Sequence, residues 1–193
     1  MTYDLGYYEE GNYVHFCTGS ILTPSIIITA GHCTYESDKT WYVRAGVLNL
    51  KYPGSVERRV RRTIEHPKYS GPTVYFDVAL VILDTAVTFN EKIQPICLPR
   101  ESSESPESMT RYTVTIQGWG SDDQGRSGEE LTQVDLTVRP MEYCNKQYQE
   151  ISFSKVSIFI PELLISSQFC ADSNLNEDAG TCYGDSGGPA MIR

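Results

Sequence analysis

The sequence is poor in positive charge. Its 16 Lys and Arg residues are outnumbered by 25 Asp and Glu residues, which gives a formal net charge of −9. Such an acidic chain is a poor candidate for binding nucleic acid or an anionic membrane, because both attract clustered Lys and Arg. The one basic run, residues 58–62, alternates around Val60, and we interpret it as the solvent-facing side of a strand.

Long apolar runs and a signal peptide are also missing. No stretch approaches the ~20 apolar residues that a membrane-spanning helix needs. Residues 1–5 have neither the basic region nor the apolar region of a signal peptide. The six cysteines nevertheless indicate an oxidising compartment. We therefore expect a secreted, extracellular protein whose natural start lies upstream of residue 1.

Helical periodicity is almost absent, whereas short runs rich in Val, Ile, Thr and Tyr recur between turn residues. One helix is predicted over residues 141–149, directly after Pro140. Polar and apolar residues alternate in residues 113–116, as a half-buried strand requires. The expected strand runs are residues 20–29, 41–47, 78–83, 112–117 and 131–138. This pattern predicts an all-β barrel or sandwich.

One change in composition divides the chain. Residues 100–111 are mainly Ser, Glu and Pro with almost nothing apolar, so we interpret them as an exposed connector. We place a first barrel at residues 1–99, the connector at 100–112 and a second barrel at 113–193. Each half is too small for a large core, and a site built from both halves would lie in the cleft between them.

A serine in a glycine-rich segment carries the strongest chemical signal. Ser186 lies in Gly-Asp-Ser-Gly-Gly-Pro, where the N–H groups of Gly184 and of the serine itself could form an oxyanion hole. A serine hydroxyl is a weak nucleophile until a base takes its proton, and His32 in Thr-Ala-Gly-His-Cys is the candidate base. Asp77 opens the apolar run Asp-Val-Ala-Leu and would hold the histidine tautomer and stabilise its cation.

Each of these assignments has an alternative. The serine motif taken alone is compatible with a glycine-rich surface turn, and the chain with a structural secreted β-domain. His15 lies in an apolar strand and is expected to be a hydrogen-bonded core histidine, whereas His66 precedes a proline in a loop and is expected to be solvated. Asp84 lies at the far end of the run that Asp77 opens. We favour His32 because it adjoins a cysteine that can fix its backbone.

Taken together, these motifs resemble the trypsin/chymotrypsin-like serine endopeptidases (peptidase S1), in which His, Asp and Ser follow one another in this order. The resemblance covers nearly the whole chain, and residues 43–99 look most like arthropod clip-domain proteases. Further matching segments are Cys17-Thr18-Gly19-Ser20, Val43-Arg44-Ala45-Gly46, His66-Pro67-Lys68-Tyr69, Ile96-Cys97-Leu98-Pro99, Gly118-Trp119-Gly120 and Val134-Asp135-Leu136. Thr18 departs from the Cys-Gly-Gly-Ser of the family.

The resemblance implies a trypsin-like fold of two six-stranded antiparallel β-barrels, the second incomplete in this chain. It implies hydrolysis of peptide bonds in protein or peptide substrates through a serine ester, with neither a metal nor an organic cofactor. The alternative function is that of a non-catalytic protease homologue acting as a binding or regulatory module. Such proteins usually lack one of the three catalytic residues, and this chain keeps all three.

Six cysteines allow 15 pairings, among which the residues alone cannot choose. The resemblance implies two disulfides, Cys17–Cys33 and Cys144–Cys170. Val114 and Ile192 occupy the positions of a third family disulfide and are expected to pack in its place. Cys97 is expected to bond to an upstream light chain or pro-domain, with a buried free thiol as the alternative. Cys182 pairs in relatives with a cysteine beyond the catalytic serine, which this chain lacks.

The resemblance also implies roles in activation and specificity. Asp185 is the acid that, in relatives, receives the ammonium group of an N-terminus freed by proteolysis, although no Ile-Val-Gly-Gly start precedes Tyr13. Gly180 corresponds to the floor of the substrate pocket and predicts a preference for apolar or aromatic side chains, unless Asp178 occupies that floor. The family's Ser-Trp-Gly strand and closing helix are missing after residue 193. We therefore expect a piece of a longer zymogen that is poorly active and aggregation-prone by itself.

Overall fold

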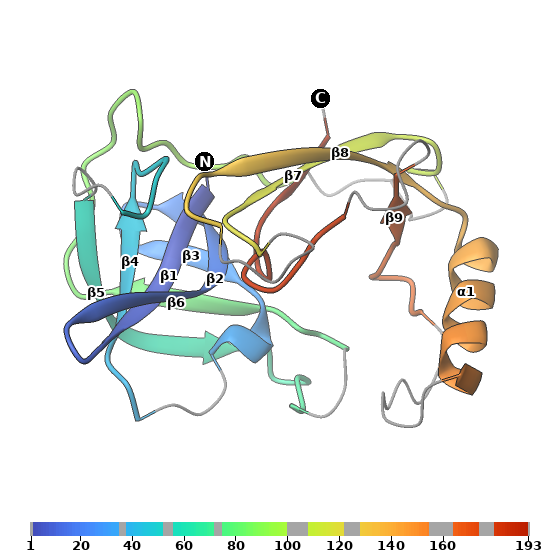
Figure 1. Cartoon of the computed structure of the whole chain (residues 1–193), viewed down its shortest axis with the longest axis horizontal. Coiled ribbons are helices and arrows are strands. Elements are labelled where there is room, and N and C mark those ends of the chain that lie inside the picture. The colour runs from blue at the N-terminus through green and yellow to red at the C-terminus, as the bar shows by residue number, and fades with distance from the viewer. Residues whose placement is uncertain are drawn as a thin grey trace.

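The computed structural model describes residues 2–34, 38–51, 56–71, 75–99, 108–121, 128–154, 164–173 and 180–192. Figure 1 shows two β-rich halves side by side, with the helix α1 at the outer end of the second half. Strands dominate both halves, so the predicted all-β class is confirmed. Within the described part of the chain, no helix is long and apolar enough to span a membrane.

The first six strands close into an antiparallel barrel. They are β1 (Thr2–Glu9), β2 (Asn12–Thr23), β3 (Ile26–Thr29), β4 (Trp41–Ala45), β5 (Val56–Glu65) and β6 (Ala79–Leu83). Hydrogen bonds connect them in the order β1-β2-β3-β6-β5-β4, and β1 pairs with both β2 and β4 to complete the ring. The six-stranded first barrel expected from the resemblance is therefore confirmed.

Two tight turns shape the start of the barrel. Glu10 and Gly11 have positive φ angles of 50° and 82° and connect β1 to β2, as a two-residue hairpin requires. The run expected over residues 20–29 is two strands rather than one, because the chain reverses at Pro24 and Ser25. Proline cannot donate to a strand ladder and favours turns, and this proline interrupts an otherwise strand-like sequence.

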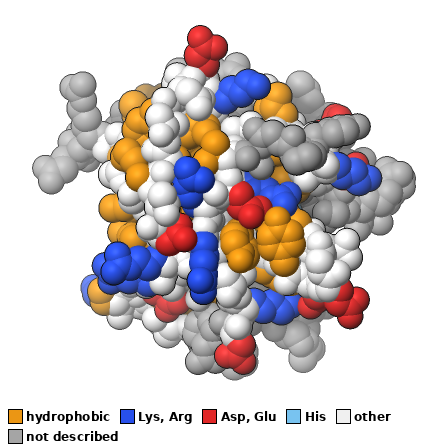
Figure 2. Space-filling model, turned by 90° about the vertical axis from the view of Figure 1, so that its left-hand side faces the viewer, with side chains coloured by type: hydrophobic (Ala, Val, Ile, Leu, Met, Phe, Trp, Pro, Cys, Tyr) orange, Lys and Arg blue, Asp and Glu red, His pale blue; other side chains and the backbone are white. Residues whose placement is uncertain are grey.

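Alternating side chains from the barrel strands fill its interior, while the basic run faces outward. The buried cluster includes Tyr3, Ile21 and Val81, and Val60 packs against it. Its basic neighbours Arg59, Arg61 and Arg62 are exposed. Figure 2 views the side of the molecule on which β5 lies, and basic side chains there are interspersed with acidic and hydrophobic ones. The basic run is thus the solvent-facing side of a strand, as predicted.

The described residues of the second half form an open sheet of four strands in the order β10-β7-β8-β9. The strands are β7 (Thr113–Gly118), β8 (Thr132–Val138), β9 (Ala171–Asp172) and β10 (Ala190–Ile192). Val114 lies directly opposite Ile192 in the β7–β10 ladder, so the two positions expected to replace a disulfide are neighbours. Val114 is completely buried, whereas Ile192 stays 47% exposed. Over the ranges that the structure describes, the second barrel is incomplete, as expected.

The helix α1 (Met141–Ser154) follows β8 and ends later than the predicted residue 149. A disulfide between Cys144 and Cys170 connects the helix to the segment before β9. A second disulfide joins Cys17 in β2 to Cys33 after β3. The structure therefore contains both disulfides that the resemblance implied.

Hydrogen bonds connect the two halves directly. Thr2 in β1 donates to Gln117 in β7 at 3.0 Å. The Leu48 carbonyl accepts from the Trp119 indole at 3.3 Å and from the Leu131 N–H at 2.7 Å. Most of the expected connector, residues 100–107, lies outside the described residues, and the domain boundaries stay a prediction.

Candidate active site

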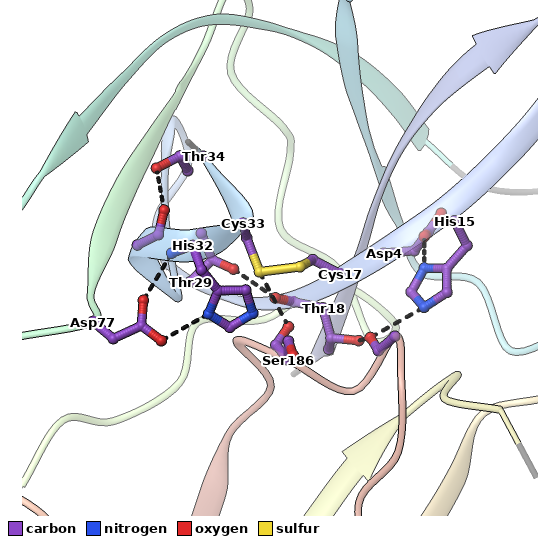
Figure 3. Close-up of a disulfide and its surroundings, with 12 residues drawn as sticks. Asp4, His15, Cys17, Thr18, Thr29, His32, Cys33, Thr34, Asp77 and Ser186 are labelled. Atoms are coloured by element: carbon purple, nitrogen blue, oxygen red, sulfur yellow. Dashed lines mark hydrogen bonds and ion pairs between the residues drawn. A yellow bond between two sulfur atoms is a disulfide. The ribbon is translucent and has the colours of Figure 1, made fainter. Parts of the chain in front are cut away.

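Two hydrogen bonds join His32 to Asp77. His32 lies in a short 3-10 helix, Gly31–Cys33, directly after β3, and Asp77 precedes β6, the strand that pairs with β3. The backbone N–H of His32 donates to Asp77 Oδ1 at 2.7 Å, and the ring Nδ1 lies 2.7 Å from Asp77 Oδ2 (Figure 3). The carboxylate is an acceptor, so we assign the ring proton to Nδ1, which leaves Nε2 able to accept a proton.

Each member of this pair shifts the pKa of the other. The hydrogen bond that His32 donates to Asp77 raises the pKa of His32 above its usual 6.5, and this effect exceeds that of burial, which lowers it. Partial burial acts to raise the pKa of Asp77, but hydrogen bonds from the His32 ring and backbone outweigh it and hold that pKa below 3.8. The His32 side chain is 49% exposed and that of Asp77 is 25% exposed. The histidine is therefore open to a ligand, while the acid is sheltered.

Ser186 lies in a turn that packs against strand β2. Its carbonyl oxygen accepts a hydrogen bond of 2.8 Å from the Thr18 N–H and lies 3.7 Å from Cys33 Sγ. A ring nitrogen of His32 lies within 4.8 Å of the sulfur atoms of Cys17 and Cys33. Figure 3 shows Ser186 beside His32 and this disulfide. The fold therefore brings His32, Asp77 and Ser186 into one region, from three distant parts of the sequence.

Two glycines allow the serine turn to approach the barrel. Gly187 has a φ of 80°, and a Cβ there would lie 2.5 Å from the Thr18 carbonyl oxygen, so only glycine fits without strain. Gly184 has a φ of 102° and is buried. Among the described residues, none accepts a hydrogen bond from the backbone N–H of Gly184 or Ser186. Both N–H groups are thus available to a bound oxygen atom.

The side chain of Asp185 binds backbone groups of the second half. Its Oδ1 accepts from the Gly120 N–H at 2.8 Å, and its Oδ2 accepts from the Cys182 N–H at 3.0 Å. A Cβ at Gly118 or Gly120 would overlap the carboxylate. The Gly-Trp-Gly segment therefore makes room for the acid next to the serine, a role that the sequence did not reveal. The predicted role of Asp185 in activation stays a prediction.

Gly180, expected to govern substrate specificity, and Cys97, expected to bond to another chain, lie at the surface. Gly180 is exposed, and nothing lies within 4 Å of where its Cβ would be, while Asp178 lies outside the described residues. Cys97 and Cys182 are both free and exposed. The alternative of a buried thiol at Cys97 is therefore wrong, because the Pro-rich segment that carries this residue lies on the surface.

The alternative candidates for the catalytic histidine and the catalytic acid occupy different environments. The side chain of His15 is only 5% exposed and is hydrogen-bonded to Asp4 and to the Gly184 carbonyl, so the prediction of a core histidine is confirmed. His66 is only partly exposed rather than fully solvated, since its ring stacks on Phe76 at a centroid distance of 5.0 Å. Asp84 is exposed at the end of β6. The partners of His15 were missed, although an acid at position 4 in an apolar strand was a signal of a buried polar contact.

One cluster near the site has the composition of a metal-binding group. Cys17, His32 and Cys33 lie close together and are the one such cluster found in the described ranges. Both sulfur atoms belong to the disulfide and have no thiolate to give to a metal ion. His32 alone could serve as a ligand there, which is too few for a stable site.

Comparisons with known proteins agree with this architecture. The trypsin family model matches residues 5–193. The chain is 32% identical to the clotting factor G beta subunit of Tachypleus tridentatus, over 98% of this chain and 61% of the relative. It is 31% identical to the serine protease Hayan of Drosophila melanogaster, over 97% of this chain and 29% of the relative. The chain thus spans less than two thirds of the length of these relatives.

A solved structure shows the same fold. Neuropsin, a serine protease expressed in the limbic system of mouse brain, superposes with a TM-score of 0.78 at 22% identity. The superposition covers 99% of this chain and 76% of the neuropsin chain. Because the family model matches almost the entire sequence, this chain belongs to the trypsin family of serine proteases.

Proposed function

We propose that the protein containing this chain is a serine endopeptidase in which Ser186 is the nucleophile, His32 the general base and Asp77 the residue that orients it. The observation that carries the proposal is the His32–Asp77 pair, with two hydrogen bonds of 2.7 Å, next to a serine turn packed on the same barrel. A buried structural histidine needs no exposed ring edge, whereas a general base does.

The mechanism follows from these contacts. His32 Nε2 takes the hydroxyl proton as Ser186 Oγ bonds to the substrate carbonyl carbon, and the negative charge formed on the carbonyl oxygen is stabilised by the N–H groups of Gly184 and Ser186. The peptide C–N bond then breaks, and the departing amine takes the proton from His32. Water repeats the same steps on the serine ester and frees the acid product and the enzyme.

Three further roles complete the proposal. Asp185 would receive the ammonium group of an N-terminus freed by proteolysis. This ammonium group would replace part of the hydrogen bonds that Asp185 now accepts from backbone N–H groups. Gly180 would form an uncharged pocket floor that favours apolar or aromatic side chains. Cys97 would bond to an upstream light chain or pro-domain, which its exposure permits. Substrates would be proteins or peptides.

We place this protease outside the cell, as a secreted zymogen. Two disulfides support an oxidising compartment, since such bonds rarely persist in the cytosol. The chemistry proposed above uses water together with side chains and backbone groups of the chain, and it needs no metal or organic cofactor.

A serine-directed phosphonate probe tests this function. We expect the full-length protein, after proteolytic activation, to be labelled at Ser186 and to hydrolyse peptide substrates. Ser186→Ala should abolish both, whereas the matched control Ser25→Ala, in the β2–β3 turn, should leave both unchanged. A folded, activated protein that the probe does not label would refute the proposal and favour a non-catalytic homologue that acts as a binding module.

A further inference from the structure

A buried polar chain connects the first barrel to the carbonyl group of Gly184. His15 Nε2 lies 3.1 Å from this carbonyl oxygen, and the Thr18 hydroxyl donates to the same oxygen at 2.8 Å. His15 Nδ1 lies 2.6 Å from Asp4 Oδ1. Figure 3 shows this chain next to the Ser186 turn. We call Asp4, His15 and Thr18 the Gly184 clamp.

The positions of the acceptors fix the number of protons in the clamp. A carbonyl oxygen only accepts, so His15 Nε2 must carry a proton to bond Gly184. The contact of 2.6 Å between Nδ1 and Asp4 Oδ1 requires a second proton between these two atoms. A neutral imidazole carries only one proton. Asp4 and His15 therefore hold one more proton than a carboxylate and a neutral ring, and together they form a net-neutral, hydrogen-bonded pair.

Burial makes each member of this pair depend on the other. The side chains of Asp4 and His15 are 0% and 5% exposed, and Asp4 Oδ2 is buried without a hydrogen-bond partner among the described residues. A buried charge is costly unless it is paired. Loss of the Asp4 side chain would therefore leave Nδ1 of His15 without its partner and free the ring to turn away from Gly184.

Other charged groups around the pair leave this proton count unchanged. Tyr13 in β2 lies near Asp4, and burial together with the charge of Asp4 raises its pKa, which keeps the phenol neutral. Arg44 in β4 lies 3.5 Å from the Tyr13 ring centroid and pairs with Glu57 in β5 at 3.0 Å. Asp185 is bound by backbone N–H groups. None of these groups bonds to His15.

The clamp acts on the residue whose N–H we assign to the oxyanion hole. Gly184 has a φ of 102°, and a Cβ there would lie 2.7 Å from His15 Nε2. On the far side of the same peptide unit, the Asp185 N–H donates to the Cys182 carbonyl at 3.1 Å. With both ends of the Gly184–Asp185 peptide held, rotation of Gly184 is restricted, and so is the direction of its own N–H.

We propose that Asp4, His15 and Thr18 are positioning residues that hold Gly184 in the conformation that completes the oxyanion hole, and that Asp4 acts by fixing the orientation of the His15 ring. This inference rests on the proposed function. The Thr18 hydroxyl belongs to the position at which the chain departs from Cys-Gly-Gly-Ser, so glycine there would lack this donor. The clamp thus gives the Gly184 carbonyl a side-chain donor that the family motif does not supply.

The test combines spectroscopy with kinetics on the full-length, activated protein. With 15N-labelled histidine, His15→Gln assigns the ring signals of His15. We expect Nε2 of His15 to carry a proton, because it donates to the Gly184 carbonyl. Asp4→Leu, which removes the partner of Nδ1, should let the ring turn away from Gly184 and shift the backbone amide signal of Gly184. The matched control Asp172→Leu, which removes a partly exposed ion pair with Arg139, should change neither signal.

Kinetics then show whether the position of Gly184 matters for turnover. Loss of one oxyanion-hole donor lowers kcat by about 10²–10³, so a misdirected donor in Asp4→Leu should lower it about 10- to 100-fold, with KM changed less than about threefold. Thr18→Val should lower kcat about tenfold. Because both variants act on one carbonyl, their effects should combine less than multiplicatively.

Each outcome has a defined meaning. An unprotonated Nε2 of His15 in the wild type, or an Asp4→Leu variant with unchanged kcat and an unchanged Gly184 signal, would overturn the proposal. If Asp4→Leu does not fold, an unchanged kcat in Thr18→Val would overturn it instead. A wild type that the phosphonate does not label would refute the proposed function, and the ring and amide signals, measured also in Ser186→Ala, would still decide whether the pair holds Gly184.

Discussion

Replacing Asp77 by Asn should reveal how much of the catalysis depends on the orientation of His32. Asp77 accepts from both the backbone N–H and the ring Nδ1 of His32, each at 2.7 Å. An Asn side chain has one acceptor oxygen and one donor NH₂. It can accept from the backbone N–H and then must donate to the ring, which forces the proton of neutral His32 onto Nε2, where it cannot act as a base for Ser186.

Asp77→Asn should lower kcat strongly and the free energy of unfolding only slightly. The wrong tautomer lowers kcat by about 10⁴ in Ser-His-Asp enzymes. The pair is only partly buried, with side chains 49% and 25% exposed, so solvent screening limits its effect on the free energy of unfolding to about 1 kcal/mol. A folded variant with almost no turnover is therefore the expected result.

The pH dependence of Asp77→Asn gives an independent check. The pKa of His32 is raised above 6.5, and the base must be neutral, so wild-type kcat/KM should rise with pH through a midpoint above 6.5. Without the carboxylate, this midpoint should move to lower pH.

The free energy of unfolding also depends on pH through this pair. The stabilisation linked to the raised pKa of His32 is fully present below pH 6.5 and is lost as the pH rises through the pKa of the folded protein. The stabilisation linked to the lowered pKa of Asp77 is present above pH 3.8 and is lost as the pH falls through the pKa of the folded protein.

The assay is hydrolysis of a fluorogenic peptide across pH 5–9 by the full-length, activated protein, with unfolding followed by circular dichroism. Asp84→Asn, at the exposed end of β6, serves as the matched control and should behave like the wild type. If Asp77→Asn keeps more than about a tenth of wild-type kcat at neutral pH, or if its pH midpoint does not move, the assignment of Asp77 is wrong.

Four further predictions follow from the same contacts. Gly187→Ala should lower kcat and the melting temperature, because a φ of 80° and a Cβ 2.5 Å from a backbone oxygen of β2 both disfavour alanine; unchanged values would contradict the docking of the serine turn. Joint replacement of Cys17 and Cys33 by Ala should lower the free energy of unfolding by about 3 kcal/mol in urea denaturation; a change under about 1 kcal/mol would argue against this crosslink. A peptide panel should show preference for Phe and Leu over Arg if Gly180 forms the pocket floor. Electrophoresis without and with reductant should show a mobility change dependent on Cys97, and none if no external partner is bound.

The sequence predicted those parts of the site that depend on short motifs. His32, Asp77 and Ser186 each lie in a segment whose local composition indicates its role, and the structure places all three segments together. Strand ends were harder to predict. The isoleucine-rich stretch on both sides of Pro24 reads as one strand by composition, and only the pairing of Ile27 with Ile21 across the turn shows two.

Contacts between distant backbone groups could not be predicted in the same way. The bond from His15 to the Gly184 carbonyl joins residues 169 apart in sequence, and a carbonyl acceptor has no sequence signature. The two short bonds that fix Asp185 also use backbone N–H groups. Composition reveals which side chains can donate or accept, but the fold decides which backbone groups lie within their reach.

A single β-bulge explains why the alternation of residues along the strands does not predict the Gly184 clamp. Asp4 lies opposite Thr18, and the register between β1 and β2 shifts by one between Leu5 and Gly6, so that Gly6 lies opposite His15. In a regular pair of strands, His15 and Thr18 are three residues apart and face opposite sides. The shift turns His15 to the side of Gly6, which is also the side of Asp4, two residues away. Strict alternation therefore separates His15 from Asp4, and the bulge brings the two side chains together within reach of the serine turn.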